Sequence, residues 1–415
     1  MIKRDYYLNK IIDKMWNGLV KVITGIRRCG KSYLLFTLFK QYLLEHGVAK
    51  ENIICIQLDR RSFVKLRNPD ELYKYINEKV NETEKYFVFI DEIQLCDDFE
   101  SVLNDFLYMN NIDLYVTGSN SKLLSKDIIT EFRGRGDEIH LHPLSFKEFF
   151  QVYDNFDDAW NDYYTFGGMP LVLTKKSDED KMIYLKDLFK ETYLKDITDR
   201  HKIQNDEVIE ELLNILSSSI GSLTNPYKLV DTFKSLKNVS VSPNTIKDYL
   251  DYLEDAYLIN KSYRYDVKGK KYINTPFKYY YTDLGLRNAR LNFRQQEENH
   301  IMENIIYNEL CIRGYSVDVG VVEINERQQD GSYIRKQLEC DFIVNKGNCK
   351  YYIQSAYHIS DDEKERQEKK SLENINDSFK KIIIVRDNIK RKRDDKGIIT
   401  MSLKDFLLND DSLDF

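Results

Sequence analysis

No apolar run in this sequence is long enough to form a membrane helix. One of the longest, from Tyr86 to Ile90, reads YFVFI, whereas a helical span needs about 20 residues. The N-terminal segment MIKRDYYLNK also lacks the apolar core of a signal peptide. These absences predict a cytoplasmic protein that has no membrane contact.

Cysteine and histidine are both scarce, with 6 residues of each in 415. The cysteines form no C-x-x-C pair, so in a chain of this length they indicate reduced thiols and neither a zinc site nor a disulfide framework. The histidines form no metal-ligand pair on a recognisable helix. Positive charge has no excess either, because 62 Lys/Arg against 68 Asp/Glu give a net charge of −6. That balance excludes a uniformly basic nucleic-acid-binding protein and leaves only local basic patches for such contacts.

What the chain does have is length for two or three domains and an alternation of strands and helices in its first third. Residues 21–145 alternate short β-rich runs with amphipathic, helix-length stretches. Such alternation predicts crossover connections and a parallel sheet with helices on both faces. Ligands of such sheets bind at the carboxyl ends of the strands. The predicted strands are Val22–Thr24, Ile53–Leu58, Phe87–Asp91, Leu114–Thr117 and Glu138–Leu141.

A phosphate-binding loop follows the first of these strands. Residues 25–32, GIRRCGKS, match G-x-x-x-x-G-K-[ST] at every fixed position. The glycines let the loop wrap so that its backbone N–H groups point at phosphate oxygens, at the start of a helix. Lys31 is expected to contact the β- and γ-phosphates, and the Ser32 hydroxyl to bind magnesium. The apolar strand before the loop and the amphipathic stretch Tyr33–Glu45 after it support a site for ATP and Mg²⁺.

An acidic pair ends the third predicted strand. The carboxylate of Asp91 is expected to reach magnesium through water, and that of Glu92 to orient or deprotonate the attacking water. A Glu directly after the Asp favours an ATPase of the additional-strand type over a GTPase or a small-molecule kinase. The alternative is an acidic pair that merely ends a strand.

Two later segments are candidates for contact with the γ-phosphate. Ser119 and Asn120 follow the strand Leu114–Thr117, which should lie between the two motif strands; a plain turn at the strand end is the alternative. Arg135 could neutralise charge in the transition state, in its own subunit or a neighbouring one, and a solvated loop arginine has equal weight. The predicted catalytic residues are Lys31, Glu92, Asn120 and Arg135. The residues predicted to bind the nucleotide are Gly25, Arg28, Cys29, Gly30, Lys31, Ser32, Tyr33, Asp91 and Ser119.

With these motifs in place, the chain resembles a prokaryotic family of AAA-type ATPases that carry a C-terminal domain of unknown function. The resemblance covers essentially the whole chain. It implies ATP binding, ATP hydrolysis, a winged-helix middle and a nuclease-like C-terminal fold. The residues that carry it are Arg27-Arg28, Ile90-Asp91-Glu92-Ile93-Gln94, Thr117-Gly118-Ser119-Asn120, Gly134-Arg135, Leu144-Ser145-Phe146-Lys147-Glu148-Phe149, Gly167-Gly168-Met169-Pro170 and Tyr281-Thr282-Asp283-Leu284-Gly285.

The middle of the chain suits a winged helix-turn-helix. Residues 226–290 hold twelve Lys/Arg against seven Asp/Glu, and the candidate wing Lys268-Gly269-Lys270-Lys271-Tyr272 is basic, which suits contact with phosphates. The would-be recognition helix argues against reading a DNA groove, because its carboxylates would repel phosphates. A structural winged helix therefore weighs equally. The carboxylates are those of Asp248, Asp251, Glu254 and Asp255.

The tail resembles the restriction-endonuclease-like fold, with Glu303, Asp341 and Gln354 as its candidate metal-binding site. Active members of that fold need a lysine two residues after the Glu or Gln, and here that position is Ala356. Lys369 or Lys370 could substitute only by folding back into the site. A degenerate nuclease fold that acts as a binding module is the preferred interpretation.

The predicted fold class is α/β: a P-loop parallel sheet, then a winged-helix domain and an α/β nuclease-like domain. The predicted domains are 1–150 (ATPase), 151–205 (helical linker or lid), 206–295 (winged helix) and 296–415 (degenerate nuclease-like). The favoured function is a DNA-associated ATPase whose nucleotide state controls its grip on double-stranded DNA. The alternatives are a signalling ATPase that acts through protein partners or homo-oligomerisation, and an ATP-gated nuclease.

Overall fold

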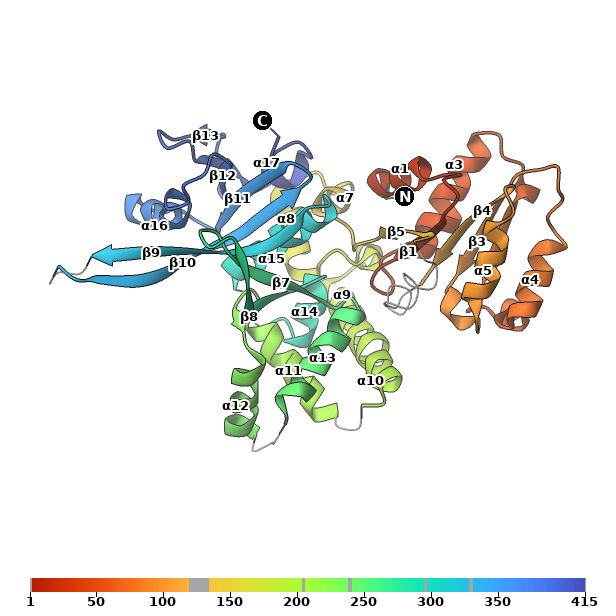
Figure 1. The fold of residues 1–415 in the computed structure, drawn as a ribbon, viewed down its shortest axis with the longest axis horizontal. Coiled ribbons are helices and arrows are strands. Elements are labelled where there is room, and N and C mark those ends of the chain that lie inside the picture. Colours follow the sequence, from red (N-terminus) through yellow and green to blue (C-terminus); the bar gives the residue numbers. More distant parts are fainter. Residues whose placement is uncertain are drawn as a thin grey trace. The chain divides into compact units, whose positions relative to one another are not determined.

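The chain folds into two compact units, each with its own sheet (Figure 1). The computed structural model describes residues 2–118, 134–203, 206–237, 241–294, 297–327 and 331–414. The first unit comprises Met1–Pro143 with Asp255–Tyr257, and the second comprises Leu144–Glu254 with Leu258–Phe415.

The first unit contains a five-stranded parallel sheet in the order β2-β3-β4-β1-β5. The sequence prediction of a parallel sheet is confirmed, and each strand lies within two residues of its predicted bounds. β4 lies between β3 and β1, as expected for a strand between the two motif strands. The strands are β1 (Val20–Thr24), β2 (Ile53–Gln57), β3 (Tyr86–Asp91), β4 (Ile112–Thr117) and β5 (Gly136–His140).

Helices cover both faces of this sheet, because alternate residues of each buried strand point to opposite sides. Val88 and Ile90 of β3 belong to a core cluster with residues of α4 and α5. Phe87 and Phe89 instead pack against the ring of Phe39, in the stretch that follows the glycine-rich loop. The helices are α1 (Asp5–Asp13), α2 (Lys31–Tyr33), α3 (Lys40–Glu45), α4 (Pro69–Asn77) and α5 (Phe99–Leu107), with a π-helical segment at Leu34–Phe39 and 3₁₀ turns at Lys50–Asn52, Arg61–Arg67 and Ile93–Leu95.

The second unit is built on a mixed nine-stranded sheet in the order β13-β14-β12-β11-β10-β9-β7-β8-β6. β9 and β10 form a long antiparallel ribbon (Figure 1). β7 pairs in parallel with β9, so one sheet runs across the predicted border at residues 295 and 296. The predicted domain borders stay predictions. The strands are β6 (Leu223–Thr224), β7 (Ile259–Asp266), β8 (Lys271–Tyr281), β9 (Ser316–Arg327), β10 (Tyr333–Lys346), β11 (Cys349–Ala356), β12 (Lys380–Val385), β13 (Lys392–Arg393) and β14 (Ile399–Ser402).

Helices stand before, between and after the strands of the second unit, and α15, α16 and α17 pack against its sheet. Three of them, α11, α12 and α13, precede the β7–β8 hairpin, which is the element order of a winged helix. The helices are α7 (Phe146–Phe150), α8 (Phe156–Phe166), α9 (Asp178–Asp187), α10 (Lys195–His201), α11 (Asp206–Ser218), α12 (Pro226–Lys237), α13 (Pro243–Asp255), α14 (Leu284–Arg290), α15 (Glu298–Ile312), α16 (Asp362–Glu373) and α17 (Leu403–Leu408), with a 3₁₀ turn at Pro170–Thr174 and a π-helical segment at Leu188–Leu194.

Two motifs of the sequence meet at a buried carboxylate in this unit. Asp283 is the N-cap of α14 and accepts the backbone N–H of Leu286 at 3.1 Å and that of Gly168 at 2.7 Å. Burial raises the pKa of Asp283 to about 6, although the backbone N–H groups around it act in the opposite direction. The carboxylate therefore ties α14 to the turn that follows α8.

Candidate functional site

The glycine-rich loop leaves β1 at Thr24 and leads into α2. Gly25 has a φ of 131°, and a Cβ on it would stand 2.1 Å from the carbonyl oxygen of Leu141. Gly30 precedes the helix with a φ of 105°. Both positions therefore need glycine. The N-terminus of a helix facing a turn of this kind is a site for anions.

The Lys31 side chain lies inside this loop. It is 5% exposed, and its ammonium donates to the carbonyl oxygens of Gly25 at 2.8 Å and Ile26 at 3.1 Å. Arg28 and Tyr33 are exposed beside it, whereas Cys29 is buried with its thiol 3.4 Å from the carbonyl oxygen of Leu141. The loop thus holds one buried positive charge at its centre, which suits a polyphosphate.

The loop and the next motif meet at the carboxylate of Asp91, which is 3% exposed. Ser32 Oγ donates to Asp91 Oδ1 at 3.1 Å, and the Thr117 hydroxyl donates to the same oxygen. Burial raises the pKa of Asp91, and the hydrogen bonds from Thr117 and Ser32 oppose that rise. Magnesium is usually held in proteins by one or two carboxylates, hydroxyls and substrate phosphates, so this set of oxygens fits Mg²⁺ carried by ATP.

Glu92 has an unusual backbone conformation, with a φ of 53°. A non-glycine residue in the left-handed region is strained by about 1 kcal/mol. Its backbone N–H donates to Thr117 Oγ1 at 3.1 Å, and the Gln94 amide donates to its carboxylate. Thr117 thus fixes the backbone of Glu92, and Gln94 fixes its carboxylate. Both residues lie in the motifs named above, but neither was predicted to have a role. Their signal in the sequence is a polar side chain at the end of β4 and another two positions beyond Glu92.

β5 adds a second set of polar side chains beside β1. Thr24 Oγ1 donates to Glu138 Oε1 at 2.5 Å and lies 3.0 Å from His140 Nδ1. Burial lowers the pKa of His140 to about 4, and the positive charges of Lys31 and Lys10 contribute. His140 is therefore neutral near pH 7.

Arg135 lies away from the loop within its own chain. Its carbonyl oxygen accepts the N–H of Val20 at 2.9 Å, so it stands at the start of β1, while the loop begins after the end of that strand. The five residues of β1 lie between Arg135 and the loop, which is about 16 Å at 3.3 Å per residue. The exposed guanidinium reaches the Tyr108 hydroxyl at 3.4 Å. Ser119 and Asn120 lie outside the described residues.

The three candidate residues of the nuclease-like tail come together in the second unit. The backbone N–H of Asp341, on β10, faces Gln354 Oε1 of β11 at 3.4 Å, and Asp341 Oδ2 accepts the N–H of Ser355 at 2.8 Å. Glu303, on α15, is buried, and its negative charge acts on Asp341. Sequence reasoning did not foresee Lys278 of β8, whose ammonium bonds Glu303 Oε1 at 2.8 Å.

The two buried carboxyls of this cluster differ in their pKa. Burial opposes ionisation of Glu303, but the Lys278 ammonium, the nearby His300 imidazole and the hydrogen bonds from Lys278 and Tyr280 outweigh it and lower its pKa to about 2. Burial and the negative charge of Glu303 raise the pKa of Asp341 well above its usual range. The cluster thus holds one ionised carboxylate bonded to an ammonium, next to a carboxyl that favours its protonated form.

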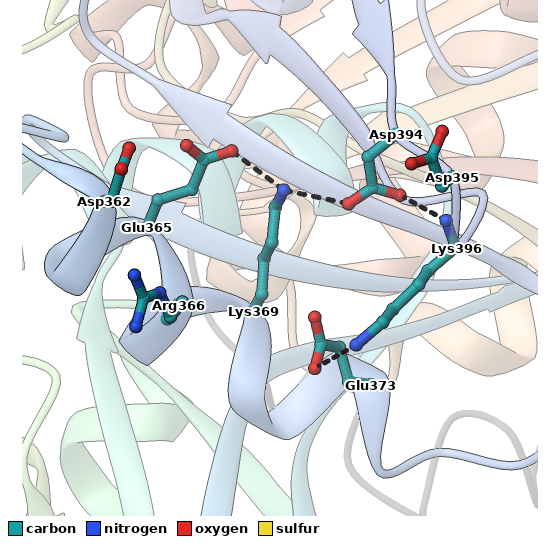
Figure 2. Close-up of a pocket in the computed structure, with 8 residues that line it drawn as sticks. All are labelled: Asp362, Glu365, Arg366, Lys369, Glu373, Asp394, Asp395 and Lys396. Carbon is teal, nitrogen blue, oxygen red and sulfur yellow. Dashed lines mark hydrogen bonds and ion pairs between the residues drawn. The ribbon is translucent and has the colours of Figure 1, made fainter.

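A charged cavity of about 340 Å³ in the second unit is lined by residues of α16 and by Asp394, Asp395 and Lys396 (Figure 2). Its walls are joined by ion pairs. Lys369 bonds Glu365 and Asp394, each at 2.8 Å, and Lys396 bonds Glu373 at 2.8 Å. Lys369 therefore does not point into the nuclease-like cluster. Both lysines of this cavity are thus engaged by carboxylates.

Comparison with known proteins identifies an AAA domain in the first unit. Residues 17–150 match the family described as AAA domain, and residues 157–297 match Domain of unknown function (DUF8612). An uncharacterized protein of Haemophilus influenzae is 33% identical over 416 residues, covering 98% of this chain and 99% of the relative. One of Methanocaldococcus jannaschii is 29% identical over 383 residues, covering 88% and 80%.

Solved structures show weaker likeness. The Orc1 protein of Aeropyrum pernix in complex with DNA has a TM-score of 0.28 at 11% identity, covering 70% of this chain and 93% of that one. DnaA of Aquifex aeolicus bound to AMPPCP has a TM-score of 0.29 at 10% identity, covering 60% and 85%. TM-scores this low support no conclusion about function.

Within the residues that the structure describes, no helix is both long and apolar enough to cross a membrane. The matches to the two family descriptions and to the relative from Haemophilus influenzae fit the geometry of the site. The glycine-rich loop and the cluster of Ser32, Asp91 and Thr117 lie in the matched AAA domain. The chain belongs to the family of prokaryotic AAA-domain P-loop ATPases in which that domain is followed by a domain of unknown function.

Proposed function

We propose that the first unit hydrolyses ATP with the help of Mg²⁺. The observation that carries this proposal is the convergence of the Ser32 and Thr117 hydroxyls on the buried Asp91 carboxylate, beside a loop with a buried lysine. Ser32 and Asp91 would hold the ion, which when bound neutralises charge on the phosphates. Lys31 would contact the β- and γ-phosphates.

Glu92 is the proposed base for the attacking water. Its carboxylate follows the metal-binding strand directly, and Thr117 and Gln94 fix its backbone and its side chain. A carboxylate held in this way can orient the water and take its proton as the water attacks the γ-phosphate. The bond from the γ-phosphate to the bridging oxygen breaks, and ADP leaves.

ATP turnover by wild type and Glu92→Gln tests this proposal. The amide keeps the size of the side chain but cannot take a proton, so turnover should fall at least ~100-fold while ATP still binds. The matched control is Glu71→Gln, the same change at an exposed carboxylate of α4, which should keep the turnover of wild type. Equal turnover by wild type and Glu92→Gln would contradict the assignment.

For the second unit, we propose association with double-stranded DNA through the hairpin of β7 and β8. Lys270 and Lys271 are exposed in its turn, next to Tyr272, which is 60% exposed. The Lys268 ammonium is bonded instead to the carbonyl oxygen of Glu323. Three helices before this hairpin support a winged-helix interpretation. The carboxylates of α13 speak against groove reading, so contact with phosphates is the proposed mode.

The DNA proposal is tested by the salt dependence of duplex binding. Replacing Lys270 and Lys271 together by alanine should weaken binding. The plot of the log of the binding constant against log salt concentration should become less steep by about 2, one unit for each phosphate contact. Lys268→Ala is the matched control and should change the slope little. ATP turnover with and without duplex DNA separates the remaining alternatives. Turnover indifferent to DNA, with no binding, would favour a switch that acts through protein partners.

A further inference from the structure

A buried lysine occupies the centre of the nuclease-like cluster. Lys278 Nζ lies 2.8 Å from Glu303 Oε1 and 2.7 Å from Glu339 Oε1, and its side chain is 3% exposed. Tyr280, two residues further along β8, donates to the same oxygen of Glu303 at 2.6 Å. The ammonium therefore joins a carboxylate of α15 to one of β10.

The remaining candidate ligands are engaged as well. Asp341 Oδ2 accepts the N–H of Ser355 at 2.8 Å, and the Gln354 amide lies close to Glu368 and Ser371. Among the residues that the structure describes, no group of three or more His, Cys, Asp or Glu side chains is arranged to hold a metal ion. The residues present therefore do not fit the divalent ion that an active nuclease of this fold would need.

No other lysine is placed to assist cleavage from the positions that the sequence suggested. Ala356 is buried on β11 where active members carry their lysine. Lys369 bonds Glu365 and Asp394 (Figure 2), and Lys370 bonds Glu326 at 2.7 Å. Lys278 is thus the cation of this cluster, and it reaches the carboxylates from a strand on which the nuclease pattern expects none.

We infer that the Lys278 ammonium stands where a divalent cation would otherwise bind, so that the second unit neither binds a metal ion at this cluster nor cleaves nucleic acid. A divalent ion at this place would compete for the oxygens that Lys278 already bonds, and the ammonium would repel it in a medium of low dielectric constant. The ion pair instead fixes β8 to α15 and β10. The inference does not depend on ATP hydrolysis by the first unit.

Removing the ammonium should open the cluster to metal. Without Lys278, the cation that joins Glu303 and Glu339 is missing, and a small dication is the species that can replace it. Mn²⁺ binding to the full chain, measured by electron paramagnetic resonance in the absence of nucleotide, tests this. Wild type should have no Mn²⁺ site at this cluster. Asp341→Asn should therefore bind as much Mn²⁺ as wild type does. Lys278→Ala should bind about one additional Mn²⁺ per chain, which Lys278→Ala/Asp341→Asn loses.

The control is Lys278→Arg, which keeps a positive charge at the cluster and should stay closed to Mn²⁺. ATP turnover equal to that of wild type checks that Lys278→Ala is folded in its first unit, and a circular-dichroism melt checks the second. Mn²⁺ bound by wild type and lost in Asp341→Asn would overturn the inference even if Lys278→Ala did not fold. A folded Lys278→Ala that binds no more Mn²⁺ than wild type would also overturn it.

Discussion

At the scale of single residues, Thr117 connects the two acidic side chains of the proposed ATPase site. Its hydroxyl donates to the Asp91 carboxylate and accepts the backbone N–H of Glu92 at 3.1 Å. Because Glu92 has a positive φ, that second bond stabilises a strained conformation. One hydroxyl thus positions both the proposed metal ligand and the proposed base.

We expect Thr117→Val to lower ATP turnover by about 10- to 100-fold, since a hydrogen bond to a charged group contributes about 1.5–3 kcal/mol. Loss of the donor also raises the pKa of Asp91 further, because burial already raises it and the Thr117 hydroxyl opposes that rise. The acidic limb of the pH profile of kcat/KM should therefore move to higher pH. Thr117→Ser keeps the hydroxyl and should resemble wild type. A Val variant with an unchanged pH profile would reduce Thr117 to a packing role.

The sequence predicted the members of this site that follow a fixed spacing. Lys31 and Ser32 lie in the glycine-rich pattern, and Asp91 ends an unmistakably apolar strand. Lys278 was missed because its partner Glu303 lies 25 residues away in the sequence and no motif joins them. A contact of this kind depends on how the strands are ordered in the sheet, which local patterns do not specify.

At the scale of elements, the strands of the first unit could be predicted because each is a short apolar run with a polar residue at its end. The order of the strands in the nine-stranded sheet could not be predicted in this way. β7 pairs with β9, and the helices α14 and α15 lie between them in the sequence. Alternation or apolar content in the sequence predicts that each strand exists, but it does not predict which strand lies next to it in the sheet. The carboxylate of Asp283 is a similar case, since its bond to Gly168 spans 115 residues.

We expect the stability contributed by Asp283 to fall as the pH rises. Its pKa is about 6 in the folded chain, against about 3.9 in an unfolded one. Between these values the folded state binds more protons, so stability is highest below pH 4 and declines by up to about 3 kcal/mol towards pH 7. Asp283→Asn lacks this dependence, and it also loses an acceptor for one of the backbone N–H groups, which costs about 1–3 kcal/mol.

Denaturation of wild type and Asp283→Asn at several pH values between 4 and 8 checks this prediction. The difference in unfolding free energy between the two should grow as the pH falls, because the other carboxyl groups titrate alike in both chains. Asp162→Asn, at a half-buried carboxylate that bonds Lys181 at 2.7 Å in the same unit, is a control that should not reproduce this trend. A difference that is constant with pH would show that Asp283 is ionised throughout.

At the scale of the whole molecule, the position of Arg135 bears on assembly. It is exposed at the start of β5, about 16 Å along the sheet from the glycine-rich loop of its own chain. If Arg135 neutralises charge in the transition state, a second copy of the chain must supply it. Arg135→Ala alone should then lower turnover about 10³-fold, the scale of an arginine contributed in trans.

Mixing two inactive variants distinguishes a partner's arginine from one that acts in its own chain. Glu92→Gln lacks the base but offers Arg135, while Arg135→Ala has an intact base and lacks the arginine. In a mixed assembly, a site of the Arg135→Ala chain can face the arginine of a Glu92→Gln chain, so turnover should rise well above the sum of the two variants. It should also rise with total protein concentration, because assembly depends on mass action. A mixture no more active than its components would leave Arg135 as a surface residue stacked on Tyr108.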